Sequence, residues 1–260
     1  MMIQKNAVVN YVYFLKEGKI FSEFERLLFK YSFELSKSYG YTINIHCNDI
    51  FKELCNELEI VPDFYFPLEE DKDINFNTFW AYHKIKVYDK QPIGEWHLDV
   101  DAFFKEVPKV HQTDLIVAYN DIPSNKDGTP YKISCLEIPP HYKMPEYASL
   151  NIHGFNASAI FFNSQELKDT YCKNAFSYIR GNNAYSKNGW EYMVWIEQAS
   201  LKQICEYYNY SYKFLIDSCD YYHIGPMKKH LPEEDLKTNI NTLKDRINNL
   251  WQLQIKHSVL

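Results

Sequence analysis

The segment EWHLDVDAFF, residues 95–104, places Asp99 and Asp101 between an extended run and an apolar stretch. Side chains at positions i and i+2 of an extended chain project to the same side, so both carboxylates can reach one cation. Mg²⁺ is usually held by one or two carboxylates together with substrate phosphates. The pair therefore indicates a metal site at the end of a strand, shared with a phosphorylated ligand. The alternative is two surface aspartates that contact only water.

Length and charge limit the classes of protein that fit. The chain has 260 residues, 46% of them hydrophobic and 24% charged, which is typical of one large or two small globular domains. A net charge of -6 argues against a nucleic-acid partner, which requires a basic face. Arginine is scarce, so phosphate recognition depends mainly on lysines and backbone N–H groups.

The cysteines and the apolar runs predict the compartment. The six cysteines are scattered without a C-x-x-C pair, so we expect them to be reduced and structural. No signal-peptide pattern opens the chain, and no apolar run approaches the ~20 residues that span a bilayer. We expect a cytoplasmic protein without a transmembrane segment, leaving peripheral membrane contact open.

Strand and helix patterns alternate along the first half, which favours a parallel sheet with helices on both faces, and the later strands are more mixed. The expected fold class is α/β, a Rossmann-like mixed sheet flanked by helices. Strands are predicted at 7–14, 41–47, the run before Asp99, 113–119, 133–138, 155–162 and 212–216. Helices are predicted from Ser22 (a capping box with Glu25) to Gly40, at 51–58 after the cap Asn48, from the cap Asn77 through Val87, from Ser164 to Arg180, and at 190–208.

The C-terminal stretch differs from the rest. We divide the chain into a domain at 1–231 and a helical extension at 232–260, in which Leu236, Ile240, Leu243, Ile247 and Leu250 form an amphipathic stripe. The stripe either packs on its own domain, or forms a homodimer or holds an acceptor-bearing partner.

A second motif, H-x-G-x-x-K, lies at His223, Gly225 and Lys228. A neutral imidazole can complete a metal shell begun by carboxylates. The glycine allows close backbone approach to a ligand, and the lysine can neutralise a diphosphate. Each residue also has an ordinary explanation as a surface histidine, a turn glycine and a solvated lysine.

The two motifs in this order resemble the GT-A glycosyltransferases, nearest to the glycogenin and lipopolysaccharide-galactosyltransferase (family 8-like) group. A helix lysine upstream of the D-x-D, an asparagine opening an apolar strand and an acidic residue followed by glutamine also resemble that group, at Lys84, Asn156 and Glu197-Gln198. The likeness runs from about residue 7 to 230. It departs where glutamate replaces the usual aspartate of the Asp-Gln pair, and where Lys229 follows Lys228 in place of proline and tryptophan.

The resemblance implies a metal-dependent glycosyltransferase with a nucleotide-diphosphate sugar donor, by default a UDP-sugar, and a saccharide, glycoconjugate or other hydroxyl acceptor. In that group the matching residues hold Mn²⁺ or Mg²⁺ (Asp99, Asp101 and His223), bind the donor (Lys84, Asp99, Asp101, Gly225 and Lys228), or line the sugar and acceptor as catalytic candidates (Asn156, Glu197 and Gln198).

Stereochemistry stays open at this point. Inversion needs a general base on the acceptor, for which Glu197 is the one candidate, whereas retention could use Glu197 or Gln198 as a weak nucleophile. The histidine motif favours retention. Alternatively, Glu197 is a helix-surface carboxylate and Asn156 a strand-end cap.

Two other functions compete with a glycosyltransferase. A sugar nucleotidyltransferase would need a glycine-rich phosphate loop, which residues 8–13 do not offer. A non-catalytic carbohydrate-binding or interaction protein on the same fold would bind its ligand without metal.

Overall fold

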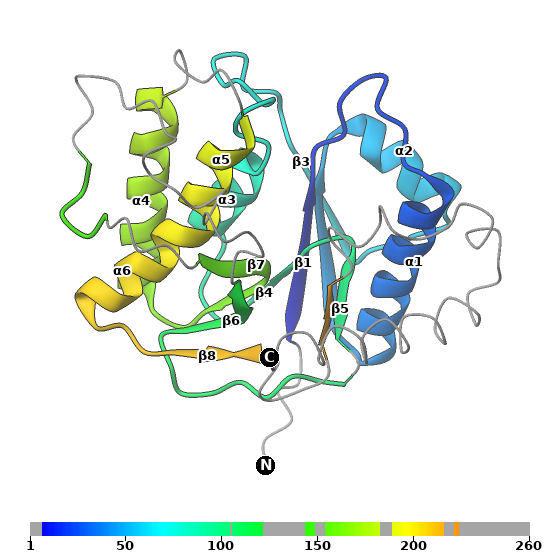
Figure 1. Cartoon of the computed structure of the whole chain (residues 1–260). Coiled ribbons are helices and arrows are strands. Elements are labelled where there is room, and N and C mark those ends of the chain that lie inside the picture. The colour runs from blue at the N-terminus through cyan, green and yellow to red at the C-terminus, as the bar shows by residue number, and fades with distance from the viewer. Residues whose placement is uncertain are drawn as a thin grey trace.

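The computed structural model describes residues 7–104, 106–121, 144–148, 154–182, 189–215 and 221–223, with no side chains described at 189–191 and 222. Within these residues the main sheet has seven strands in the order β3-β2-β1-β4-β7-β6-β8, and β5 pairs with β9 in a separate sheet (Figure 1). The strands are β1 (Val8–Tyr13), β2 (Thr42–Cys47), β3 (Phe64–Pro67), β4 (Trp96–Leu98), β5 (Ala102–Phe104), β6 (Leu115–Asp121), β7 (Gly154–Phe162), β8 (Tyr212–Phe214) and β9 (Tyr221–His223).

The sheet is mixed, as the sequence predicts. Strands β3, β2, β1 and β4 are parallel to one another, whereas β7 runs antiparallel to both β4 and β6. Strand β8 is parallel to β6. The expected α/β class with a mixed sheet flanked by helices is therefore confirmed.

Helices cover both faces of the sheet. Helices α1 (Glu23–Ser38) and α2 (Asp49–Glu57) lie on one side, and the other side carries α3 (Tyr82–Lys90), α4 (Gln165–Asn182), α5 (Gly189–Val194) and α6 (Ser200–Tyr208) (Figure 1). Two hydrophobic clusters fill the two interfaces, one around Tyr11 and Phe29, the other around Ile160 and Tyr171. Strand β7 contributes to both clusters, because Ile160 belongs to one and Phe161 to the other.

The predicted start of α1 is confirmed. The Ser22 side chain accepts a hydrogen bond from the backbone N–H of Glu25, and the Glu25 carboxylate accepts one from the N–H of Ser22. This capping box satisfies two N–H groups that the first helical turn leaves without partners. The predicted Asn48 cap of α2 is also present.

The predicted cap at Asn77 is wrong. Helix α3 begins at Tyr82, and its N-cap Ala81 makes no side-chain hydrogen bond. The Asn77 side chain instead accepts a hydrogen bond from Lys16 Nζ at 2.6 Å, and the backbone N–H of Asn77 donates to the Asn75 side chain. Asparagine forms such local turns as readily as it caps helices. Phe79 and Trp80 therefore precede the helix rather than belong to it.

Other boundaries differ in smaller ways. Strand β3 was not predicted, and it is a four-residue edge strand whose Phe64 is exposed, so it lacks the buried alternation of a typical strand. The strand predicted at 212–216 ends at Phe214. The strand predicted at 133–138, the helical extension at 232–260 and the boundary between the two proposed domains lie outside the described residues.

The described cysteines, Cys47, Cys55, Cys172 and Cys205, are free and buried, as expected for structural thiols. Within the part of the chain that the structure describes, none of the helices has the length and apolar character needed to cross a bilayer.

Candidate active site

The two aspartates of the D-x-D motif lie in the turn between β4 and β5. The N–H of Asp99 donates to the carbonyl of Ser158 on β7 at 2.8 Å, and the Asp99 carbonyl accepts from the N–H of Ala102 at 3.0 Å. The segment is therefore a tight turn and not the extended chain from which we argued that both carboxylates share one side. The Asp101 side chain is 12% exposed, whereas the Asp99 side chain is 33% exposed.

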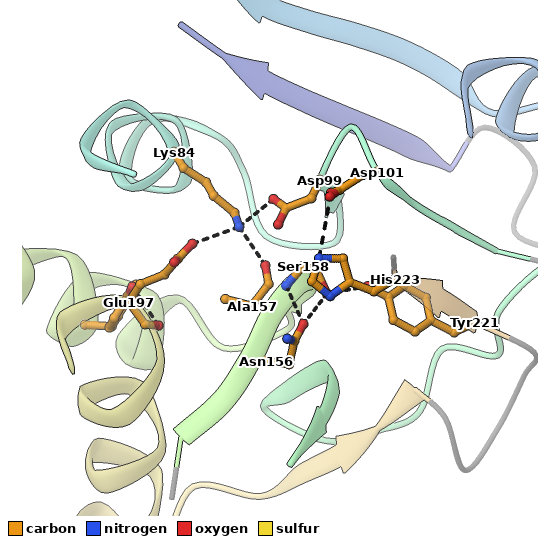
Figure 2. Close-up of polar contacts among 10 residues, drawn as sticks. Lys84, Asp99, Asp101, Asn156, Ala157, Ser158, Glu197, Tyr221 and His223 are labelled. Atoms are coloured by element: carbon orange, nitrogen blue, oxygen red, sulfur yellow. Dashed lines mark hydrogen bonds and ion pairs between the residues drawn. The ribbon is translucent and has the colours of Figure 1, made fainter. Parts of the chain in front are cut away.

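His223 reaches the aspartates through the small sheet. Strand β9 pairs antiparallel with β5, which sets His223 opposite Ala102, the residue after Asp101. The His223 Nε2 atom lies 3.7 Å from Asp101 Oδ1, and one ligand atom each of Asp99, Asp101 and His223 lies within 4.8 Å of the others. Figure 2 shows Asp101 and His223 facing each other beside Asp99. The structure thus brings together the three predicted metal ligands.

The chemistry of this donor set fits a divalent cation. Carboxylate oxygens suit Mg²⁺ and Mn²⁺, and an imidazole nitrogen is a common additional ligand. The buried Nδ1 atom of His223 has no hydrogen-bond partner among the described residues, so no hydrogen bond at that atom prevents the ring from binding a cation. The residues present can therefore hold Mn²⁺ or Mg²⁺.

Lys84 lies beside the aspartates and joins three elements. Its Nζ atom is 2.6 Å from Asp99 Oδ1 and 2.8 Å from Glu197 Oε1, and it donates to the carbonyl of Ala157 at 2.8 Å (Figure 2). The contact with Glu197 is an ion pair and lacks hydrogen-bond alignment. The predicted donor-binding lysine is thus engaged by the protein itself in this structure.

Burial and charge act in opposite directions on this buried pair. Burial alone would lower the pKa of Lys84, but the carboxylates of Asp99 and Glu197 outweigh it and raise that pKa well above its ordinary value. Burial raises the pKa of Glu197, and Lys84 opposes that shift. The lysine is therefore charged at physiological pH, and its charge stabilises the ionised form of the buried carboxylate.

Glu197 occupies an irregular turn of its helix. The predicted helix at 190–208 is present, but the five residues Trp195–Ala199 form a π-helical turn between α5 and α6. Such turns often occur at functional sites. Glu197 is 1% exposed, so the alternative of a helix-surface carboxylate is wrong. Gln198 beside it is half-buried.

Asn156 lies near the start of β7, and sequence reasoning missed the residues with which it interacts. Its Oδ1 atom accepts from the N–H of Ser158 at 3.1 Å and from the Ser158 hydroxyl, which also contacts the Tyr221 hydroxyl. Ser158, Tyr221 and the carbonyl of Ala157 were not predicted site residues. A serine within an apolar strand is a weak signal, and nothing in the sequence pairs it with Tyr221.

Strand β7 carries a bulge at this point. Val117 pairs with Ile160 and Tyr119 with Asn156, so β6 advances by two residues (117 to 119) where β7 advances by four (156 to 160). Bulges near active sites redirect side chains and backbone groups. Here the bulge contains Ala157 and Ser158, whose carbonyls face Lys84 and Asp99. Gly225 and Lys228 lie outside the described residues.

No protein-family model matches the sequence, and no curated protein matches it significantly. Solved structures that it resembles include the glycosyltransferase GlyE of Streptococcus pneumoniae TIGR4, at 9% identity and a TM-score of 0.43 over 82% of this chain and 46% of that one. A galactosyltransferase LgtC complex with donor and acceptor sugar analogues has 7% identity and a TM-score of 0.41, over 74% of this chain and 70% of that one.

A third similar structure is 4-diphosphocytidyl-2C-methyl-D-erythritol synthase from Anaerococcus prevotii DSM 20548, at 6% identity and a TM-score of 0.39, over 82% of this chain and 87% of that one. The chain spans about half the length of the GlyE chain. At these TM-scores the likenesses assign no function, which depends on the residues of the site.

Proposed function

We propose that this protein is a metal-dependent glycosyltransferase that moves a sugar from a nucleotide-diphosphate donor, by default a UDP-sugar, to a saccharide or other hydroxyl acceptor. The observation that carries the proposal is the convergence of Asp99, Asp101 and His223 beside the buried Lys84–Glu197 pair. Two carboxylates and an imidazole suit a cation that also binds phosphate oxygens. The four cysteines within the described residues are buried and free, which supports a reducing, cytoplasmic setting.

Each residue has a defined part in the proposed reaction. Asp99, Asp101 and His223 would hold Mn²⁺ or Mg²⁺, which would supply Lewis-acid stabilisation of the leaving nucleotide diphosphate. Lys84 fixes the Asp99 carboxylate and balances the charge of Glu197. Gly225 and Lys228 are the proposed contacts to the donor diphosphate, and Asn156 and Gln198 are proposed to line the sugar and acceptor.

The placement of Glu197 supports retention of anomeric configuration. A general base must come within hydrogen-bond reach of the acceptor hydroxyl. Glu197 is 1% exposed and paired with Lys84, so its carboxylate is withdrawn from an incoming acceptor. We therefore propose a retaining enzyme in which Glu197 positions Lys84. The anomeric configuration of the product, measured by NMR, tests this assignment.

A thermal-shift screen of nucleoside diphosphates with and without Mn²⁺ tests the proposed function. A ligand that binds only the folded protein stabilises it by about 2.7 kcal/mol at a hundredfold excess over Kd. We expect a Mn²⁺-dependent stabilisation by one diphosphate, lost in Asp101→Asn. The exposed Glu53 on α2 provides the control Glu53→Gln, which should respond like wild type.

The same screen separates the competing functions. A non-catalytic carbohydrate-binding protein would show no Mn²⁺-dependent response to any diphosphate, and this result would contradict the proposal. A nucleotidyltransferase would respond to nucleoside triphosphates and release pyrophosphate when supplied with a sugar phosphate.

A further inference from the structure

We propose that Ser158 and Tyr221 are positioning residues for the metal site, holding Asp99 and His223 in register through groups that do not touch the cation. The inference rests on the metal site of the proposed function. Ser158 is 1% exposed and Tyr221 is fully buried, so neither side chain is available to a ligand in bulk solvent. Their effect on the cation would be exerted through the residues that they hold.

The first link is a backbone contact. Strand β4 pairs with β7 up to Leu98 and Ala159, and the next hydrogen bond runs from the Asp99 N–H to the Ser158 carbonyl. This bond extends the ladder by one residue at the point where the D-x-D turn begins. The bulge in β7 sets the orientation of that carbonyl, because it lies between the paired residues Asn156 and Ile160.

The second link is a side-chain contact to β9. The Ser158 hydroxyl contacts the hydroxyl of Tyr221, which lies two residues before His223 on the same strand. Residues i and i+2 of a strand project to the same face. Strand β9 has three residues, and in the described part of the chain it pairs with β5 alone. A two-stranded sheet of this size is marginal by itself, so its position depends on buried contacts with the rest of the fold. For β5 one such contact is the hydrogen bond from Ser32 to the Ala102 carbonyl, and for β9 it is the contact between Tyr221 and Ser158.

The direction of the hydrogen bonds follows from the donors available. The Oδ1 atom of Asn156 can only accept, so the Ser158 hydroxyl donates its single proton to it. The Tyr221 hydroxyl must therefore donate to Ser158 Oγ. The resulting chain runs from Tyr221 through Ser158 to Asn156 (Figure 2). It joins the strand of one metal ligand to the proposed sugar-binding asparagine.

Mn²⁺ affinity of the full chain, measured by electron paramagnetic resonance and calorimetry, tests the inference without requiring turnover. We expect Ser158→Ala and Tyr221→Phe each to weaken Mn²⁺ binding by roughly 10- to 100-fold, the range found for groups that orient metal ligands. The double variant should bind Mn²⁺ only slightly more weakly than the single variant with the lower affinity, because both substitutions break the same link.

Tyr11→Phe is the matched control. Tyr11 is also fully buried, and its hydroxyl contacts Ser32 and Ser36 on the α1 face of the sheet. Ser32 donates its own proton to the Ala102 carbonyl, and Tyr11→Phe removes neither atom of that bond. This substitution removes the same atom from an equally buried ring. It should lower the thermal stability while leaving Mn²⁺ affinity at the wild-type value.

The outcomes separate the inference from the proposed function. If wild type binds Mn²⁺, Asp101→Asn does not, and both positioning variants bind like wild type, the inference is overturned and the metal site stands. If wild type itself fails to bind Mn²⁺, the metal site is overturned together with the inference. Should Ser158→Ala fail to fold, Tyr221→Phe, which keeps the aromatic ring, decides the question alone.

Discussion

Lys84 shows at the scale of one residue how the site depends on charge balance. Its Nζ atom pairs with Glu197, which is 1% exposed, and with the more accessible Asp99. Removing one partner of a buried ion pair leaves an uncompensated charge and typically costs about 3–5 kcal/mol. We expect Lys84→Met to lower the free energy of unfolding by that amount, as measured by urea denaturation.

The control and the compensating variant use neighbouring residues. Lys90 lies on the same helix but is exposed. The control Lys90→Met should lower the free energy of unfolding by less than about 1 kcal/mol. Adding Glu197→Gln to Lys84→Met removes the stranded charge, so the double variant should recover much of the loss. Equal stability of Lys84→Met and wild type would show that the pair does not support the fold.

His46 gives a prediction for pH. Burial lowers its pKa from 6.5 to about 4, with a smaller contribution from Lys90, and its Nε2 atom lies 3.0 Å from the Asn10 side chain. Because the unfolded chain binds this proton more tightly, stability is lost as the pH falls from about 6.5 to about 4, by up to ~3 kcal/mol. Above that window the histidine contributes no pH dependence.

The variant His46→Gln should flatten this profile. Urea denaturation at pH 7.5 and at pH 4.5 should show a smaller difference for His46→Gln than for wild type. A residual difference is expected, because burial also lowers the pKa of His97 well below its ordinary value. Parallel profiles for the two proteins would contradict the assignment to His46.

At the scale of elements, the start of α1 is the sharpest test of a sequence signal. Ser22 caps the helix reciprocally with Glu25. Replacing a serine N-cap by alanine typically costs ~1 kcal/mol. We expect Ser22→Ala to lose that amount in thermal or urea unfolding. Ser38→Ala at the other end removes only an exposed hydroxyl bonded to the Leu35 carbonyl and should be nearly neutral; an equal loss in both would argue against the capping box.

Ser22 and Asn77 show which element boundaries the sequence can predict. The Ser22 signal is local, because the residue that completes it is three positions away. Asparagine is an equally good cap by residue type, but the Asn77 side chain accepts a hydrogen bond from Lys16, which is far away in the sequence. The predicted helix at 190–208 was correct in extent, but its regular helical spacing gave no sign of the π-helical turn Trp195–Ala199, in which Glu197 pairs with Lys84 of another helix.

At the scale of the molecule, β7 contributes side chains to the hydrophobic clusters on both faces of the sheet and so connects them. We therefore expect one cooperative unfolding transition. Ile45 and Ile179 are fully buried in different clusters, so Ile45→Val and Ile179→Val should each cost about 0.5–1.5 kcal/mol, and their effects should add within about 0.5 kcal/mol. Two separate transitions, each sensitive to one variant, would contradict a single cooperative unit.

The candidate site could be predicted only in part, for reasons that also belong to the whole molecule. The motifs and the family resemblance pointed to Asp99, Asp101, His223, Lys84 and Glu197, which the structure places together. The extended geometry assumed for the aspartates was wrong, because the turn is set by contacts with β7 and β5. Ser158 and Tyr221 were missed because their meeting depends on a bulge and a strand pairing between distant segments.

The strand order has a consequence for how fast this chain can fold. Val9 pairs with Trp96, and Leu98 with Ala159, so the centre of the sheet forms only after long stretches of chain have closed into loops. The entropy of that closure is lost before the pairing contributes energy. Topologies dominated by such distant contacts fold on the order of milliseconds to seconds. During that interval β1 and β2 can pair with each other while the β1 edge still awaits β4.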